Sequence, residues 1–133
     1  MKFENIRFKA WDKQNNLMYD VEQLDLKNKR IYNSNIHSIT ISIDGVILLP
    51  YTGFKDKNGT KIYEGDIIKM DNDSLGDDTR YIIDKQFLGL GYRKINSGKC
   101  DFLPLCSLEK YFHEKRVEKV GNVFINPELL NEN

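Results

Sequence analysis

The residues of this 133-residue chain that are best suited to chemistry are basic side chains that could contact phosphate groups. They stand around a polar turn in the middle of the chain and in the segment that follows it: Lys55, Lys57, Lys61, Arg80, Arg93 and Lys94. Lysine and arginine make most of the phosphate contacts of nucleic-acid-binding proteins. The overall charge counts against this use, because 20 Lys and Arg residues balance 20 Asp and Glu residues, whereas nucleic-acid binders more often have a basic surplus.

Carboxylates offer a second kind of chemistry. Asp25, with Leu26 and Lys27 after it, matches half of a metal-dependent nuclease motif, and Asp12 or Asp20 could supply the second carboxylate. Such tripeptides arise by chance in highly charged chains. Metal-dependent nuclease activity is therefore a distant alternative.

The cysteines and histidines do not form a recognisable metal site. Cys100 and Cys106 are interpreted as reduced thiols, while His37 and His113 are isolated in the sequence and form no short ligand pair. The acidic segment 71–78 begins like a calcium loop but lacks the ligands needed at its fifth and twelfth positions. We expect no cofactor, no metal and no catalytic residue, and hence no enzyme.

The central polar segment is also explained by backbone geometry. Residues Asp56 to Gly59 have the composition of a tight turn, and Gly59 is expected at positive φ after Asn58. Gly65 is expected at positive φ in a second turn, where Asp66 accepts a local backbone hydrogen bond. We favour this structural role over phosphate binding for Asp56, Gly59, Gly65 and Asp66.

Short strands and frequent turns dominate the rest of the pattern. Apolar segments on either side of the polar turn 12–16 predict a hairpin. Asp44-Gly45, between the β-branched segment 36–43 and the apolar segment 46–50, predicts another.

One helix is predicted near the C-terminus. It begins with Ser107 as N-cap and carries a stripe of Leu108, Tyr111, Phe112 and Lys115 at helical spacing. A strand over 117–120, a turn at Gly121-Asn122 and one helical turn from Pro127 close the chain. The fold class that follows is mainly β: a small barrel- or sandwich-like single domain over residues 1–133, with many short strands and one short helix near the C-terminus.

Three segments in order carry a family resemblance: Arg7 to Asp12 with the following Met18-Tyr19, Tyr51 to Lys69, and Val120 to Leu130. They resemble the signature of the YopX-like family of bacteriophage and prophage proteins. The resemblance implies a mainly β domain from a temperate phage or prophage region. It carries over no catalytic residue.

Two hypotheses about function follow. The first is a phage- or prophage-encoded accessory protein that is a non-catalytic protein-binding module, with a host or phage protein or a second copy of the chain as partner. The alternative is a nucleic-acid-binding small β-barrel module. No apolar run approaches the roughly 20 residues of a membrane span, and the first residues lack the apolar region of a signal peptide. We therefore expect no membrane association and a cytoplasmic location in the bacterial host.

Overall fold

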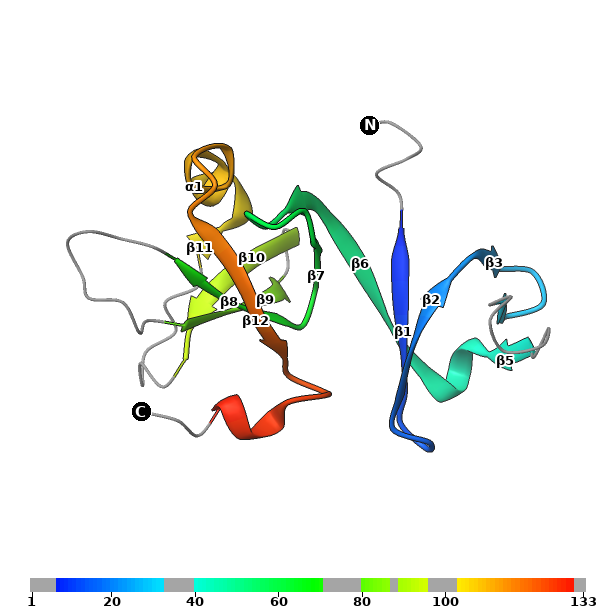
Figure 1. Ribbon diagram of the computed structural model, residues 1–133. Helices are drawn as coiled ribbons and strands as arrows, with labels where there is room; N and C mark the ends of the chain where they lie inside the picture. Colours follow the sequence, from blue (N-terminus) through cyan, green and yellow to red (C-terminus); the bar gives the residue numbers. More distant parts are fainter. Residues whose placement is uncertain (1–6, 33–39, 71–79, 87–88, 96–102, 131–133) are drawn as a thin grey trace. The chain divides into compact units, whose positions relative to one another are not determined.

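The computed structural model describes residues 7–32, 40–70, 80–86, 89–95 and 103–130. Its strands, drawn in Figure 1, are β1 (Phe8–Asp12), β2 (Leu17–Val21), β3 (Gln23–Asp25), β4 (Arg30–Tyr32), β5 (Thr40–Ser42), β6 (Val46–Lys55), β7 (Lys61–Tyr63), β8 (Asp66–Met70), β9 (Arg80–Gln86), β10 (Gly89–Lys94), β11 (Leu103–Pro104) and β12 (Val117–Asn122). The helical segments are the 3₁₀ turns η3 (Ile43–Gly45), η4 (Leu105–Leu108) and η5 (Pro127–Leu130), and the α-helix α1 (Glu109–His113). The predicted mainly β fold with one short α-helix near the C-terminus is confirmed.

The chain divides into two compact units. Unit 1 comprises Met1–Tyr51 and unit 2 comprises Thr52–Asn133. Strand β6 passes through the boundary between them. This division does not test the prediction of a single domain over residues 1–133, which stays a prediction.

Unit 1 is built from two small antiparallel arrangements. Strand β1 pairs with β2 on one side and with β6 on the other, and β4 pairs with both β3 and β5. The predicted hairpin at 12–16 is confirmed as the β1–β2 connection, where the Asp12 carboxylate accepts backbone hydrogen bonds from Gln14 and Asn15. Among the residues of this unit that the structure describes, the buried apolar ones are Ala10, Trp11, Ile31 and Leu49.

The hairpin predicted at Asp44-Gly45 is wrong. These residues belong to η3, and the strands on either side pair with other strands: β5 with β4, and β6 with β1. A two-residue hairpin turn of the type that Asp-Gly favours needs positive φ at its central residues. Neither Asp44 nor Gly45 has a positive φ. Sheet pairing over longer sequence distances has overridden the local turn signal.

Unit 2 contains a five-stranded antiparallel sheet in the order β11-β10-β9-β8-β12. Its apolar core is made by alternating strand residues together with α1 and η4: Ile62, Ile68, Met70, Ile83, Tyr92, Leu108, Phe112 and Val117. The Phe54 ring stacks on Phe112 with their centroids 4.5 Å apart. Burial of these side chains is the main source of stability for the unit.

The predicted helix is shorter than expected and begins differently. Only Glu109–His113 is α-helical, and Leu108 rather than Ser107 is its N-cap. The Ser107 hydroxyl instead donates to the Pro104 carbonyl oxygen and hydrogen-bonds the Tyr92 hydroxyl, at 2.9 Å in each case. These tertiary and local bonds use the oxygen that would have capped the helix.

The C-terminal segment also differs in detail from the prediction. The turn expected at Gly121-Asn122 is wrong, because β12 continues through Asn122 after a register shift between Lys119 and Gly121. The chain turns over 123–125 instead. The helical turn expected from Pro127 is confirmed as η5.

Candidate functional site

The turn between β7 and β8 is the structural centre of the candidate site. Gly65 has a φ of +90°, as the sequence predicts, and Gly59 has a φ of +85°. The Gly65 amide donates to the Ile83 carbonyl oxygen at 2.7 Å, and its carbonyl oxygen accepts from the Val123 amide at 2.9 Å. The turn is therefore bound to β9 and to the segment that follows β12.

The carboxylate of Asp66 holds the same β7–β8 turn in place through its hydrogen bonds. It is 1% exposed, and its Oδ2 accepts the Tyr63 amide at 2.8 Å, which is the local hydrogen bond that the sequence predicts. Its Oδ1 accepts Asn122 Nδ2 at 2.9 Å and lies 3.2 Å from Lys119 Nζ. A buried carboxylate with several donors of this kind is costly to disturb.

Hydrogen bonds of Asn122, the last residue of β12, and of Asn126 fold the segment after β12 back on itself. Asn122 Oδ1 accepts the Phe124 amide at 2.9 Å, and the Asn122 amide donates to Asn126 Oδ1 at 3.1 Å. This places the Phe124 ring against Gly65: a Cβ at position 65 would lie 3.0 Å from Phe124 Cε2. A glycine is needed there for its φ and for this close contact.

A cleft of about 320 Å³ lies beside this turn in unit 2. It is lined mainly by apolar groups and has three charged residues: Gly65, Ile82, Ile83, Val123, Phe124 and Leu130, with Glu64, Asp84 and Arg93. Its volume is at the small end of the range for ligand pockets. Asp84 Oδ2 and Arg93 Nε are 3.0 Å apart, and both side chains are partly exposed. The opposite charges of Asp84 and Arg93 neutralise each other. Glu64 is therefore the one of the three charged lining residues that has no ion-pair partner in the described part of the chain.

Glu64 has the most unusual environment in the cleft. The residue is 8% exposed, and its Oε1 has no hydrogen-bond partner among the described residues. Burial raises the pKa of the Glu64 carboxyl; the nearby charge of Lys85 lowers this pKa and that of Asp84 raises it. Buried polar atoms almost always have partners, so an unpartnered carboxyl oxygen beside a cleft marks a candidate binding site.

Asp56 organises the first predicted turn, Asp56 to Gly59, and also accepts a hydrogen bond from outside it. Its Oδ1 accepts the amides of Asn58 and Thr60, both at 2.9 Å. Its Oδ2 accepts the amide of Lys119, 63 residues further along the chain, at 3.0 Å. The Asp56 carboxylate therefore forms the local turn and also connects the β6–β7 turn to β12.

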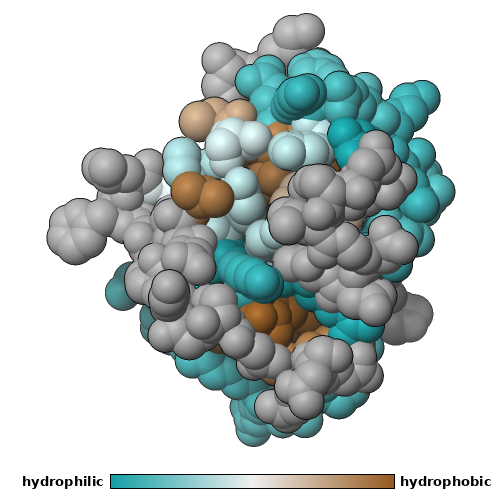
Figure 2. All heavy atoms as spheres, turned by 90° about the vertical axis from the view of Figure 1, so that its left-hand side faces the viewer, coloured by the Kyte–Doolittle hydropathy of each residue, from teal (hydrophilic) through white to brown (hydrophobic). Residues whose placement is uncertain are grey.

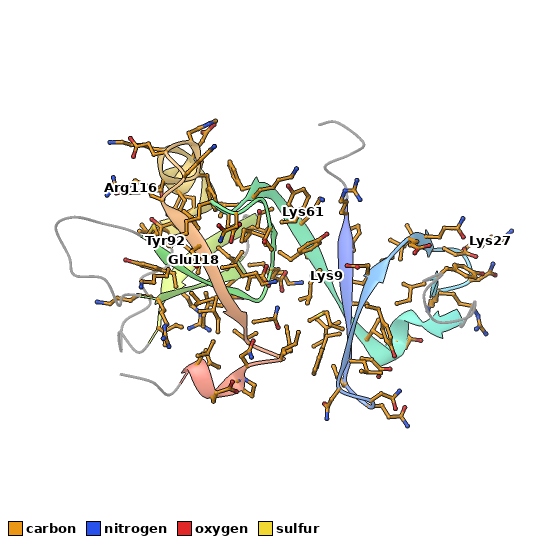
Figure 3. All side chains as sticks on the ribbon, viewed as in Figure 1. Lys9, Lys27, Lys61, Tyr92, Arg116 and Glu118 are labelled. Atoms are coloured by element: carbon orange, nitrogen blue, oxygen red, sulfur yellow. The ribbon has the colours of Figure 1, made fainter. Side chains whose placement is uncertain are left out.

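The predicted basic residues lie on several elements of unit 2. Lys55, Lys61, Arg80 and Lys94 are on β6, β7, β9 and β10, and Figure 3 labels Lys61. Ion pairs with described carboxylates are formed by Lys57, whose Nζ lies 3.4 Å from Glu118 Oε2, and by Arg93, which pairs with Asp84. Contact of these residues with phosphate stays a prediction.

The residues considered for a nuclease or metal site lie on several different elements, and some of them lie outside the described ranges. Asp25 accepts hydrogen bonds from the amide and side chain of Asn28 in the β3–β4 turn. Cys106 is a free, exposed thiol, and His113 lies 3.6 Å from Glu109 in an exposed pair. Within the described ranges, no cluster of three or more His, Cys, Asp or Glu residues could hold a metal. His37, Cys100 and the segment 71–78 lie outside the described residues.

Sequence reasoning predicted Gly65 and Asp66 but missed Glu64, Asp84 and Phe124 as a group. Glu64 looked like part of an ordinary polar turn. Its one distinguishing signal is that apolar residues surround it closely, from Ile62 and Tyr63 to Ile67. Asp84 and Phe124 carried no signal, because only the pairing of β9 and the folding back after β12 bring them to the cleft.

The fold and the cleft thus define a mainly β protein with a small, mostly apolar cleft that has one acid without an ion-pair partner among the described residues. In the described part of the chain, no helix has the length and apolar character needed to cross a membrane. The model of the family described as YopX protein matches residues 7–131, and the chain belongs to the YopX family.

The comparison with solved structures shows the fold. The chain is similar to the crystal structure of protein EF1440 from Enterococcus faecalis, with a TM-score of 0.60 and 20% sequence identity. The alignment covers 94% of this chain and 97% of that one. No curated protein matches the sequence.

Proposed function

We propose that the chain is a phage- or prophage-encoded accessory protein that acts in the cytoplasm of the bacterial host as a non-catalytic protein-binding module. The observation that carries this proposal is the cleft of unit 2, with apolar walls and the partner-free Oε1 of Glu64. Apolar walls with a few polar groups are typical of binding sites. The phage origin is supported by the resemblance to the YopX-like family.

The charges of the site favour a protein partner over a nucleic-acid backbone. Two of the three charged residues that line the cleft, Glu64 and Asp84, are acidic, and the third, Arg93, is already paired with Asp84, so the described lining offers a phosphate no unpaired basic side chain. The basic residues Lys57 and Arg93 already face carboxylates. Contact of these two residues with phosphate would have to replace their ion pairs.

Exposed apolar side chains offer further contact surface near the described strands of unit 2. Leu103, Val120 and Ile125 are 48%, 36% and 55% exposed. On the face drawn in Figure 2, hydrophobic atoms form separate patches between hydrophilic ones. We predict that a protein partner is bound through an apolar patch of several hundred Å².

Affinity capture followed by a salt series tests the proposal. The tagged full chain is cross-linked in host cells, its partners are identified by mass spectrometry, and purified chain is loaded on DNA and RNA columns. We expect a reproducible protein partner or a second copy of the chain, and weak retention on either column. Strong retention that falls steeply with salt, without a protein partner, would instead establish the nucleic-acid alternative.

A further inference from the structure

We propose that the cleft of unit 2 receives a basic side chain, lysine or arginine, of the protein partner. This inference rests on the proposed function and names the chemistry by which the partner is recognised. The juxtaposition that carries it is the nearly buried Glu64, whose Oε1 lacks a partner, beside a cleft walled by Phe124 and aliphatic side chains.

Charge complementarity selects a cation. Among the described residues, the charged groups around Glu64 are Asp84 and Lys85 on β9 and Arg93 on β10. Arg93 is held by Asp84 at 3.0 Å, and Lys85 donates no hydrogen bond to Glu64 Oε1. An incoming ammonium or guanidinium group would supply the missing hydrogen-bond donors and the opposite charge together.

The apolar walls of the cleft fit the rest of such a side chain. Lysine and arginine have apolar stems that pack along hydrophobic surface while the charged end reaches a polar group. Ile82, Ile83, Val123 and Leu130 offer that surface. The Phe124 side chain also lines the cleft and adds to its apolar wall.

The bound cation also changes the protonation of Glu64. Burial raises the pKa of the Glu64 carboxyl in the free protein, and a neighbouring positive charge favours the ionised form. Binding therefore lowers this pKa and releases a proton wherever Glu64 was protonated. Because Oε1 is covered in the structure, its engagement requires a small movement of the cleft wall.

NMR titration of the isotope-labelled full chain tests this inference without knowledge of the partner. The probes are N-acetyl-arginine amide and N-acetyl-lysine amide, with N-acetyl-glutamine amide as the neutral control. The two cationic probes should shift the signals of Phe124 and Ile83 and lower the Glu64 pKa that is read from its carboxyl carbon. The same response to the glutamine derivative, or no response to any probe, would overturn the proposal.

Two variants make the test specific. Glu64→Gln keeps the size of the side chain and removes the charge, and should weaken binding of the cationic probes at least tenfold. Glu109→Gln makes the same change on α1, where Glu109 is exposed and does not line the cleft, and should bind them as the parent does. Equal binding by Glu64→Gln and the parent would contradict the assignment.

The outcomes separate this inference from the proposed function. Glu64-dependent binding of the probes, with no protein partner captured from cells, would uphold the basic-side-chain site and refute the protein-binding function. A captured partner that binds Glu64→Gln as tightly as the parent would uphold the function and refute the site.

Discussion

Replacement of Asp56 by alanine should destabilise unit 2 more than a change in an exposed turn normally does. The carboxylate accepts three backbone amides, from Asn58, Thr60 and Lys119, at 2.9, 2.9 and 3.0 Å. Asp56 itself is buried. In Asp56→Ala all three amides lose their acceptor, and the connection between the β6–β7 turn and β12 loses one of its hydrogen bonds.

The magnitude follows from how accessible each amide is to water. Asn58 and Thr60 are exposed residues, so water can replace much of what their amides lose. The Lys119 bond is partly buried, and an unsatisfied buried donor costs about 1–3 kcal/mol. The backbone bond from the Lys57 amide to Val117 remains and limits the damage. We expect a total loss of about 2–4 kcal/mol in the free energy of unfolding.

Urea unfolding followed by circular dichroism measures this loss, and amide hydrogen exchange at Lys119 locates it. Asp25→Ala is the matched control, because Asp25 also accepts the hydrogen bonds of a turn, both of them from Asn28 three residues away. The control should cost about 1 kcal/mol or less. A cost for Asp56→Ala no larger than that of the control, with unchanged exchange at Lys119, would refute the role assigned to the long-range bond.

Three further predictions concern the same unit. Gly65→Val should lower the free energy of unfolding in urea by about 1–3 kcal/mol, because position 65 has positive φ and faces Phe124; a curve that overlays the parent's would show an ordinary backbone there. Phe112→Ala should cost about 3–5 kcal/mol by thermal melting, since the buried ring stacks on Phe54; a small loss would mean that the core collapses around the gap. The melting temperature of Glu64→Gln should rise relative to that of the parent as the pH increases from about 4.5. Burial raises the pKa of Glu64 in the folded state, so the stability that the protonated carboxyl gives the parent is present below the unfolded-state pKa and is lost as the pH rises through the folded-state pKa. A difference in melting temperature that does not change with pH would contradict the burial of an unpartnered carboxyl.

The fold class was predictable from the sequence because it depends on patterns that are local. The 12–16 turn between apolar segments gave the β1–β2 hairpin, and the positive φ of Gly59 and Gly65 followed from their turn composition. The hairpin predicted at Asp44-Gly45 was wrong because strand pairing over a long sequence distance decided the structure there. Its local hairpin signal competed with pairing of β6 to β1, and that pairing joins residues that are far apart in the sequence.

The candidate site was predictable only in part. Asp66 and its bond to Tyr63 lie within four residues of chain, whereas the partners Asn122 and Lys119 come from β12. Glu64 Oε1 lacks a hydrogen-bond partner because of how the side chains around it pack, and residue type alone does not predict this. Nothing in the sequence places Phe124 and Asp84 beside it, because three separate elements must first come together.

The measurement that tests the central claim most directly is the dissociation constant of the captured protein partner for three proteins: the parent, Glu64→Gln and Glu109→Gln. All three are compared at the same ionic strength, with circular dichroism to confirm that each is folded. Our account predicts at least tenfold weaker binding by Glu64→Gln and an unchanged constant for Glu109→Gln. Equal constants for all three proteins would contradict the claim that a basic side chain of the partner binds in the Glu64 cleft.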